Sequence, residues 1–296
     1  MAQPLWYPPT LPDLTGRTVV VTGANSGLGA VTARELARAG AHTVLAVRDI
    51  AKGRAVADPL PGRTEVRALD LGDLDSVRAF AGGWSGPLDI LVNNAGVMPV
   101  TRETTADGFE SAVGVNHLGH FALTNLLLPY ITDRIVTVSS GLARIGHIDL
   151  ADLNWEHRAY RPMRAYGQSK LANLLFTQEL DRRLTASGSP VRALAAHPGV
   201  AATPLDRHLT GFVGASTTFG YRFIAQKEVD YGALPTLFAA TEDLPGNTYI
   251  GPGGRSSELP RTEKRRKADS DPGTARRLWD LSVALTGTDA PTEVAV

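Results

Sequence analysis

Short apolar runs alternate with longer amphipathic segments along most of this chain. The strand-like runs are four to eight residues long, rich in Val, Leu and Ile, and cover residues 17–23, 42–48, 64–70, 89–96, 134–140 and 191–199. Between them the pattern predicts helices at about 27–39, 49–57 and 73–81, and residues 247–254 read as a last strand near an edge. Strands that are apolar on both faces and alternate with helices are typical of a covered parallel sheet. The chain is therefore predicted to be α/β, a doubly wound Rossmann-type domain with a mostly parallel sheet and helices on both faces.

The pattern gives no sign of a second domain. Proline and glycine are scattered as loop residues instead of gathering at a boundary, and there is no internal repeat. We expect a single domain over residues 1–296, with a core of about 15–254 and a C-terminal helix and tail after 270.

Composition narrows the function classes. Lys plus Arg and Asp plus Glu both number 30, so the net charge is zero and nothing attracts nucleic acid. The chain has no cysteine, which excludes disulfides and thiolate metal sites. Its start lacks a secretory signal, and polar residues interrupt the most apolar helical stretch, residues 118–131, so no membrane partner is expected. We expect a cytoplasmic protein.

A glycine-rich turn follows the first predicted strand. The segment TGANSGLG, residues 22–29, lies where a strand ends and a helix begins. Gly23 allows a tight turn, and Gly27 and Gly29 let the backbone approach a pyrophosphate at the helix N-terminus, where free N–H groups favour negative charge. The residues assigned to this cofactor cradle are Gly23, Asn25, Ser26, Gly27, Leu28 and Gly29. A purely structural strand–helix turn is the alternative.

The end of the second strand bears on the choice of dinucleotide. An acidic residue there would bind the ribose 2′-hydroxyl, whereas an arginine accommodates a 2′-phosphate. Val47 occupies the position of the acidic residue and Arg48 follows it. The pattern favours NADP(H) over NAD(H), but Asp49 could pair with Arg48 or face the ribose, so use of NAD(H) stays open.

Two more strand ends carry polar residues suited to the cofactor. Asp70, followed by Leu71, ends the third strand and could accept from the adenine amino group. Asn93, Ala95 and Gly96 follow the fourth strand, near the expected ribose and nicotinamide. Ordinary turn roles for Asp and Asn are the alternative.

A tyrosine and a lysine lie four residues apart at the start of a helical segment. Tyr166 and Lys170, in AYGQSK, would share one helix face with Cβ atoms about 5–6 Å apart. A nearby ammonium lowers the pKa of a tyrosine, ordinarily near 10, toward neutrality and so suits it to proton transfer. The alternative is a tyrosine that covers a lysine side chain on a solvated helix.

Taken in order, these motifs resemble a known family. The series TGANSGLG, NNAG, Asn116, VSS, YGQSK and HPGV resembles the short-chain dehydrogenase/reductase family over residues 15–254 or more. The segments AVRDIAKG, GVNHLGHFALTNLLLP, SKLANLLFTQEL, HPGVAATPL and LWDLSVALTG are similar to its retinol-dehydrogenase-like subgroup.

The resemblance implies four catalytic residues. Tyr166 would donate a proton to the carbonyl oxygen in reduction and remove it in oxidation. Lys170 would hold the ribose hydroxyls and lower the pKa of the tyrosine. Ser140 would hydrogen-bond the substrate oxygen and stabilise its developing charge. Asn116 would fix a water that links Lys170 to solvent.

The resemblance also assigns the nicotinamide end of the site. Thr203 would hold the carboxamide, next to Pro198 and Gly199. Residues 142–165 and the segment after Thr203 would wall in the substrate, and that segment could be a mobile lid or could pack on the sheet. Members of the family often pair through helices near 118–131 and 166–184, so a homo-oligomer is possible, but the 142–165 segment could change or block this pairing.

Two departures from the family pattern limit what is carried over. Ser140 and Tyr166 lie 26 residues apart, more than is usual in the family, but the intervening segment resembles the longer one of the subgroup. The chain also lacks the apolar N-terminal segment of anchored members, so its substrate need not be a membrane retinoid. His147 and His157 match no metal-ligand spacing, and we expect no metal.

We therefore expect an NADP(H)-dependent oxidoreductase that transfers hydride between nicotinamide and a small-molecule carbonyl or alcohol substrate of apolar character. The alternative is a non-enzymatic NADP-binding sensor or interaction protein on the same fold. Degenerate members of such folds usually lose the tyrosine or lysine, whereas this chain keeps Ser140, Tyr166 and Lys170, which favours the enzyme.

Overall fold

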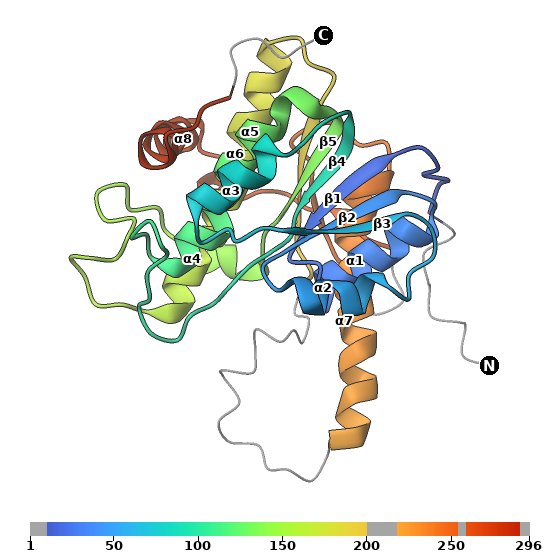
Figure 1. Ribbon diagram of the computed structural model, residues 1–296. Coiled ribbons are helices and arrows are strands. Elements are labelled where there is room, and N and C mark those ends of the chain that lie inside the picture. The colour runs from blue at the N-terminus through green and yellow to red at the C-terminus, as the bar shows by residue number, and fades with distance from the viewer. Residues whose placement is uncertain (1–10, 200–217, 254–258, 291–296) are drawn as a thin grey trace.

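One eight-stranded sheet organises the molecule (Figure 1). The computed structural model describes residues 11–199, 218–253 and 259–290, and of residues 218–228 only the backbone. The strand order is β3-β2-β1-β4-β5-β6-β7-β8, with β1 to β7 parallel and β8 antiparallel. The strands are β1 (Thr18–Thr22), β2 (His42–Val47), β3 (Thr64–Ala68), β4 (Leu88–Asn93), β5 (Ile131–Val138), β6 (Arg192–Ala196), β7 (Tyr249–Gly251) and β8 (Arg261–Thr262).

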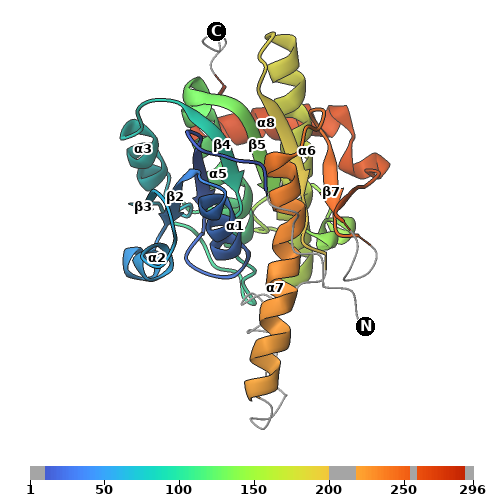
Figure 2. The ribbon, with the colours of Figure 1, turned by 90° about the vertical axis from the view of Figure 1, so that its right-hand side faces the viewer.

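Alternate residues of each central strand serve two separate apolar layers. Val20 and Leu91 pack with α3 (Leu74–Gly82), α5 (Gly119–Leu127) and α6 (Pro162–Ala186). Their neighbours in the strands, such as Val19 and Ile90, pack with α1 (Gly27–Arg38), α2 (Ile50–Ala57) and α7 (Thr218–Thr241) on the opposite face. Figure 2 shows α1 and α7 in front of the sheet. The continuous apolar runs arise because both strand faces are buried.

Local sequence signals mark several helix ends. Asp49 and Asp73 cap α2 and α3 by accepting backbone N–H groups. Helix α6 begins at Pro162, which is favoured at a first helical position because its missing N–H has no intrahelical partner there.

One more helix covers α5 and α6 on the side away from the sheet. Helix α8 (Pro272–Thr286) packs on α6 and α5, and its Trp279 ring centroid lies 4.9 Å from that of Phe121 and 5.8 Å from that of Phe176. The expected C-terminal helix after 270 is thus part of the core, and it covers the outer side of two helices that the family resemblance offered for subunit pairing.

The sheet edge differs from the sequence prediction. Residues 249–251 are followed outward by β8, which belongs to the basic stretch of residues 261–267, where the apolar pattern predicts no strand. Within that stretch Arg265 is largely buried and donates to the carbonyl oxygens of Leu174 and Asn247 at 2.7 and 3.3 Å. Burial lowers the pKa of Arg265 to about 10. These partners lie far away in sequence, so local polarity could not reveal them.

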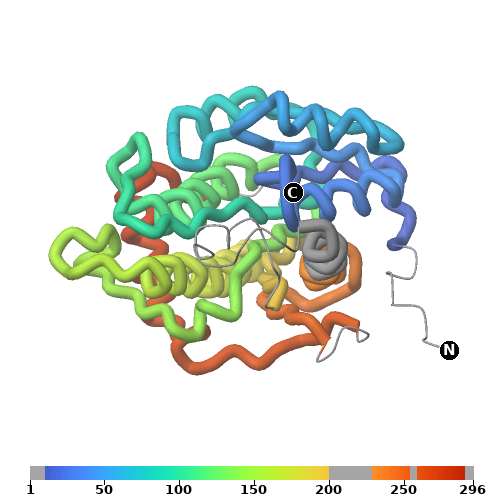
Figure 3. The backbone as a smooth tube through the Cα atoms, turned by 90° about the horizontal axis from the view of Figure 1, so that it is seen from below, coloured from blue at the N-terminus to red at the C-terminus, as the bar shows by residue number. Residues whose placement is uncertain are grey.

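Loops and short helices close the carboxyl edge of the sheet (Figure 3). The short helices at this edge are α4 (Ser111–Val113), the π-helix η1 (Gly114–Leu118) and η3 (Gly141–Ile145). Two other short helices are η2 (Leu128–Tyr130), which precedes β5, and η5 (Lys267–Asp269), which precedes α8. The loop after β4 lies beside the segment between β5 and α6, where Arg102 donates to the carbonyl of Asn154 at 3.1 Å. Over the described residues, no helix combines the length and apolarity that crossing a bilayer requires.

Candidate active site

A pocket of about 660 Å³ opens at the carboxyl ends of the central strands. It lies at the switch point of the strand order, between β1 and β4, where doubly wound sheets bind ligands. The sequence-predicted residues that line it are Gly23, Asn25, Ser26, Gly27, Leu28, Gly29, Arg48, Asp70, Leu71, Ala95, Gly96, Ser140, Tyr166, Lys170, Pro198 and Gly199. Asp70 also accepts from the backbone N–H of Gly72 at 2.9 Å, which holds the turn after β3.

The pocket has further lining residues that sequence reasoning did not single out. They are Ala46, Leu69, Asn94, Val97, Met98, Val115, Val138, Ser139, Gly141 and Leu142. Most of these residues directly precede or follow a predicted site residue. Their position at the end of a strand could therefore have identified them from the sequence. Val115 precedes the predicted Asn116 but does not lie at a strand end, because it belongs to the π-helix η1 and only the fold brings it to the pocket.

The glycine turn has the conformation that its sequence predicts. Gly23 and Gly27 have φ values of +66° and +55°, a left-handed region that glycine adopts without strain. Gly29 lines the pocket and also has a packing role, because a Cβ there would lie 2.6 Å from the carbonyl oxygen of Gly23 and collide with the amide of Asn94. It therefore keeps α1 close to the strand ends. The Ser26 side chain makes no capping hydrogen bond at the start of α1.

Arg48 is a basic residue of the pocket and directly follows β2. Asp49, which could have paired with it, instead accepts from the backbone N–H of Lys52 at 3.0 Å and pairs with Lys52 Nζ at 2.9 Å. No carboxylate in the described ranges forms an ion pair with Arg48. The guanidinium is exposed and available to an anion.

The two asparagines at the end of β4 have different surroundings. Asn93, predicted to contact the cofactor, is fully buried and donates to Thr124 Oγ1 at 2.8 Å, so it does not line the pocket. Asn94 does line the pocket, and its amide donates to the carbonyl of Thr22 at 2.8 Å. Successive strand residues point to opposite sides, and the fold decides which one faces the ligand.

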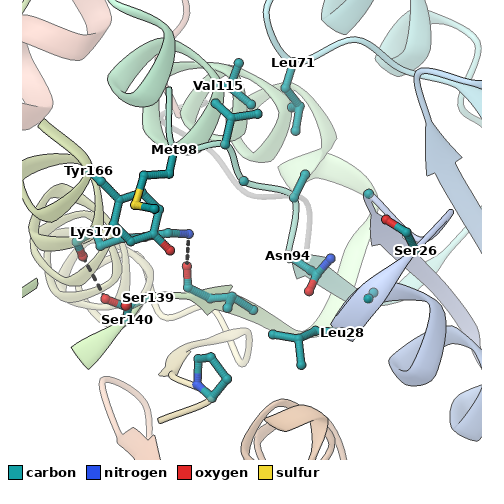
Figure 4. Close-up of a pocket in the computed structure, with 18 of the residues that line it drawn as sticks. Ser26, Leu28, Leu71, Asn94, Met98, Val115, Ser139, Ser140, Tyr166 and Lys170 are labelled. Atoms are coloured by element: carbon teal, nitrogen blue, oxygen red, sulfur yellow. Dashed lines mark hydrogen bonds between the residues drawn. The ribbon is translucent and has the colours of Figure 1, made fainter. Parts of the chain in front are cut away.

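Tyr166 and Lys170 point into the same pocket from one face of α6 (Figure 4). Lys170 Nζ lies 5.8 Å from the Tyr166 ring centroid and donates to the Val138 carbonyl at 3.0 Å. Ser139 Oγ donates to the carbonyl of Lys170 at 2.8 Å and ties α6 to the end of β5. Burial lowers the pKa of Lys170 to about 8.

Ser140 and the segment 197–199 complete the part of the pocket that contains Tyr166 and Lys170. Ser140 lines the pocket and its Oγ accepts from the backbone N–H of Leu142 at 3.2 Å, so its hydroxyl proton can still be donated. His197 Nδ1 accepts from the Gly199 N–H at 3.1 Å, and its Nε2 lies 3.2 Å from Glu263. These contacts place Pro198 and Gly199 against the pocket. Thr203 lies outside the described residues.

Asn116 stands behind the pocket wall, in the π-helix η1. Its Oδ1 accepts from the Val97 N–H at 2.7 Å, and its Nδ2 donates to the Val97 carbonyl at 3.0 Å and to Ser169 Oγ at 2.9 Å. It thereby anchors the loop after β4, whose Gly96 lies next to Lys170 Nζ.

Apolar side chains line part of the pocket, and Val97, Met98, Val115 and Leu142 are among them. Figure 4 shows Met98 beside Tyr166, whereas Val115 lies beside Leu71. The predicted wall of residues 142–165 contributes Leu142, whereas the segment after Thr203 lies outside the described side chains.

The histidines of the long segment after β5 lie apart from this chemistry. His147 and His157 are exposed. Across 11–199, 218–253 and 259–290, no three His, Asp or Glu side chains gather as metal ligands would.

Comparison with known proteins agrees with this geometry. A family model described as short chain dehydrogenase matches residues 17–212. Human "Retinol dehydrogenase 13" is 46% identical over 300 residues, covering 96% of this chain and 88% of the relative. Mouse "Polyprenol dehydrogenase" is 41% identical over 303 residues, covering 95% and 87%. A crystal structure of an uncharacterized protein from Mycobacterium Paratuberculosis superposes with a TM-score of 0.84 at 54% identity, covering 95% of this chain and 97% of the other.

Proposed function

The chain belongs to the short-chain dehydrogenase family, and from this premise we propose that it is an NADP(H)-dependent oxidoreductase acting on apolar alcohols or carbonyl compounds. The observation that carries the proposal is that Ser140, Tyr166 and Lys170 share one pocket with the glycine turn at the start of α1. Relatives named retinol and polyprenol dehydrogenases support an oxidoreductase that acts on alcohols or carbonyls.

The residues present fit a nicotinamide dinucleotide. Gly23 and Gly27 leave the backbone open at the N-terminus of α1, where an anion is stabilised by free N–H groups and the helix dipole. Arg48 would bind a 2′-phosphate through its planar fork of donors. Pro198 and Gly199 would border the nicotinamide, which when bound supplies or accepts the hydride.

Tyr166 would exchange the proton at the substrate oxygen. In reduction its hydroxyl donates a proton to the carbonyl oxygen, and in oxidation the phenolate removes it from the alcohol. The ammonium of Lys170, held at 3.0 Å by the Val138 carbonyl, supplies the nearby positive charge that favours a phenolate. The Ser140 hydroxyl would donate to the same substrate oxygen and stabilise the charge that develops on it.

Asn116 would take part through its backbone. Its side chain is committed to Val97 and Ser169, so only its carbonyl oxygen is left to hold a relay water near Lys170. A carbonyl oxygen has two lone pairs and can accept twice.

The substrate is proposed to be a bulky apolar alcohol or its aldehyde or ketone. The apolar side chains of Val97, Met98 and Leu142 offer no polar group that would orient a polar chain beyond the reacting oxygen. The names of the relatives, which refer to retinol and polyprenol, agree with this chemistry.

The competing function is a non-enzymatic NADP-binding protein on the same fold. Such a protein would need the glycine turn and Arg48 but would have no use for a proton donor beside the nicotinamide. The presence of Ser140, Tyr166 and Lys170 around one pocket therefore favours catalysis.

The test is NADPH oxidation with a panel of apolar and polar aldehydes and ketones that includes retinal. We expect turnover with apolar members and, in Tyr166→Phe, a loss of kcat of about 10²- to 10⁴-fold with NADPH affinity retained, because general acid–base catalysis contributes roughly that factor. Unchanged activity in Tyr166→Phe would refute the mechanism. NADPH binding without turnover of any compound would favour the binding protein.

A further inference from the structure

A buried histidine stands behind the site and takes no part in the steps above. His120, on α5, is 1% exposed and does not line the pocket. Both of its ring nitrogens nevertheless have partners at hydrogen-bond distance. Nε2 lies 2.9 Å from Thr22 Oγ1, at the start of the glycine turn, and Nδ1 lies 3.1 Å from the carbonyl oxygen of Asn116.

The partners of the ring define its tautomer. The Asn116 carbonyl can only accept, so Nδ1 must carry the proton. Nε2 is then an acceptor for the Thr22 hydroxyl. Thr22 Oγ1 in turn accepts from the backbone N–H groups of Asn94 and Ala95 at 2.9 and 3.0 Å, so its own proton is left to donate. Two acceptors lie within reach of this proton, and His120 Nε2 at 2.9 Å is nearer than the Val92 carbonyl oxygen at 3.4 Å.

His120 also stays uncharged. Burial lowers its pKa to about 3, and the backbone hydrogen bond to Asn116 does not offset this. A neutral ring keeps one donor and one acceptor, which is what its two partners require.

The hydrogen bonds continue beyond Asn116 to the tyrosine helix. Asn116 Nδ2 donates to Ser169 Oγ at 2.9 Å, and Ser169 Oγ donates to the carbonyl of Tyr166 at 2.8 Å. An unbroken line therefore runs from Thr22 through His120, Asn116 and Ser169 to Tyr166. It connects β1 of the cofactor cradle with the first turns of α6.

We propose that His120 is a positioning residue, which in its Nδ1–H tautomer fixes the Asn116 carbonyl relative to the glycine turn and thereby aligns the cofactor cradle with Tyr166. The roles of Asn116 and Tyr166 in this inference rest on the proposed function. Displacement of a catalytic group by about 1 Å can cost roughly 10²-fold in rate, so a link of this kind matters for turnover more than for binding.

The tautomer can be measured in the unmodified protein. ¹⁵N NMR of histidine-labelled protein at neutral pH should show His120 neutral and protonated on Nδ1, with its signals identified by their loss in His120→Gln. An Nε2-protonated or charged ring would overturn the proposal. This result does not depend on turnover, so absence of reductase activity would count against the proposed function alone.

Three substitutions separate the two hydrogen bonds. In His120→Asn the amide nitrogen stands near the position of Nδ1 and keeps the donor to Asn116. In His120→Gln the amide oxygen can still accept from Thr22. His120→Leu removes both. We expect the Leu and Gln variants to lose kcat by about tenfold or more, with the KM for NADPH little changed in Gln, and the Asn variant to keep kcat within about threefold of the parent.

Melting temperatures of all three variants provide the control for a purely structural role. Equal losses of kcat in Asn and Leu would overturn the proposal, because the donor to Asn116 would then be irrelevant. Full kcat in every variant with only a lower melting temperature would overturn it too. If His120→Leu fails to fold, the comparison of kcat between His120→Asn and His120→Gln and the measured tautomer of His120 still test the proposal.

Discussion

At the scale of single residues, Arg48 is the side chain that we expect to discriminate between NADPH and NADH. Its guanidinium is exposed at the pocket, and the neighbouring carboxylate of Asp49 is occupied by the first turn of α2 and by Lys52. A 2′-phosphate would therefore meet an arginine with no competing ion pair in the described ranges.

Arg48→Ala should weaken NADPH binding and leave NADH binding almost unchanged. A hydrogen bond to a charged group contributes about 1.5–3 kcal/mol, so the dissociation constant for NADPH should rise roughly 10- to 100-fold. Fluorescence titration with both dinucleotides measures this. Arg54→Ala, at an exposed position on α2, is the matched control, and equal losses for NADPH and NADH in Arg48→Ala would contradict the assignment.

The buried ammonium of Lys170 lowers the free energy of unfolding of the protein. Its ammonium is buried, and burial lowers its pKa from 10.5 to about 8. Between these values the unfolded chain binds the proton and the folded chain does not, so stability rises with pH. Below pH 8 both states are protonated and the folded state bears the full penalty of about 3 kcal/mol.

Lys170→Met should therefore stabilise the cofactor-free protein at pH 7 by up to about 3 kcal/mol while abolishing turnover. The Val138 carbonyl keeps a partner in the variant, because Asn173 Nδ2 also donates to it at 3.2 Å. Denaturant unfolding of parent and variant from pH 7 to 10.5 tests this. The advantage of the variant should vanish toward pH 10.5, and parallel pH profiles would show that Lys170 does not bear the penalty.

At the scale of elements, Arg158 fastens the long segment between β5 and α6. Its guanidinium stacks 3.8 Å from the Trp155 ring centroid, donates to Asp149 at 3.1 Å and donates to Gln168 Oε1 at 2.8 Å. Gln168 is fully buried two residues after Tyr166. The segment and the catalytic helix are thus held together next to the apolar wall.

Arg158→Lys keeps the charge but loses the planar fork and the stacking. We expect the KM for an apolar substrate to rise several-fold, roughly 1 kcal/mol, with NADPH affinity unchanged, because the wall near Leu142 loosens while the cradle does not. Steady-state kinetics measure this. Arg164→Lys, exposed on the first turns of α6, should behave like the parent, and identical kinetics in both variants would show that Arg158 does not hold the wall.

At the scale of the whole molecule, α8 covers the outer surface of α5 and α6, the two helices that could otherwise associate with a second subunit. Trp279 packs against Phe121 and Phe176, and Arg183 lies 4.4 Å over its ring. The aromatic residues of α5 and α6 therefore find their apolar partner within the chain. This leaves little reason for pairing of subunits through the same two helices.

We expect a monomer in light scattering at micromolar concentration. Trp279→Ala should lower the free energy of unfolding by about 3–5 kcal/mol, since a large buried aromatic leaves a cavity when truncated. Arg276→Ala, exposed on the same helix, should have almost no effect. A stable dimer of the parent protein would show that pairing uses a different surface or displaces α8.

The sequence alone determined the layers of the fold and most of the site. Apolar runs such as residues 17–23 and 89–96 identify buried parallel strands, because a strand that is covered on both faces is apolar at nearly every position. The sequence alone identified Gly23, Ser140, Tyr166 and Lys170 as candidate site residues, because a turn conformation and a helical spacing are local properties. Their order along the chain is the order of the family's motifs, and this order alone connects them to one site.

Only the tertiary structure decided what depends on distant partners. It placed the side chain of Asn93 in the core and that of Asn94 in the pocket, and it paired Arg265 with the backbone carbonyls of Leu174 and Asn247. It also brought His120 between Thr22 and Asn116, three residues whose relation no local pattern contains. The physical reason is common to these cases. A buried polar group needs a hydrogen-bond partner, and where that partner lies is fixed by how the chain packs, not by its neighbours in sequence.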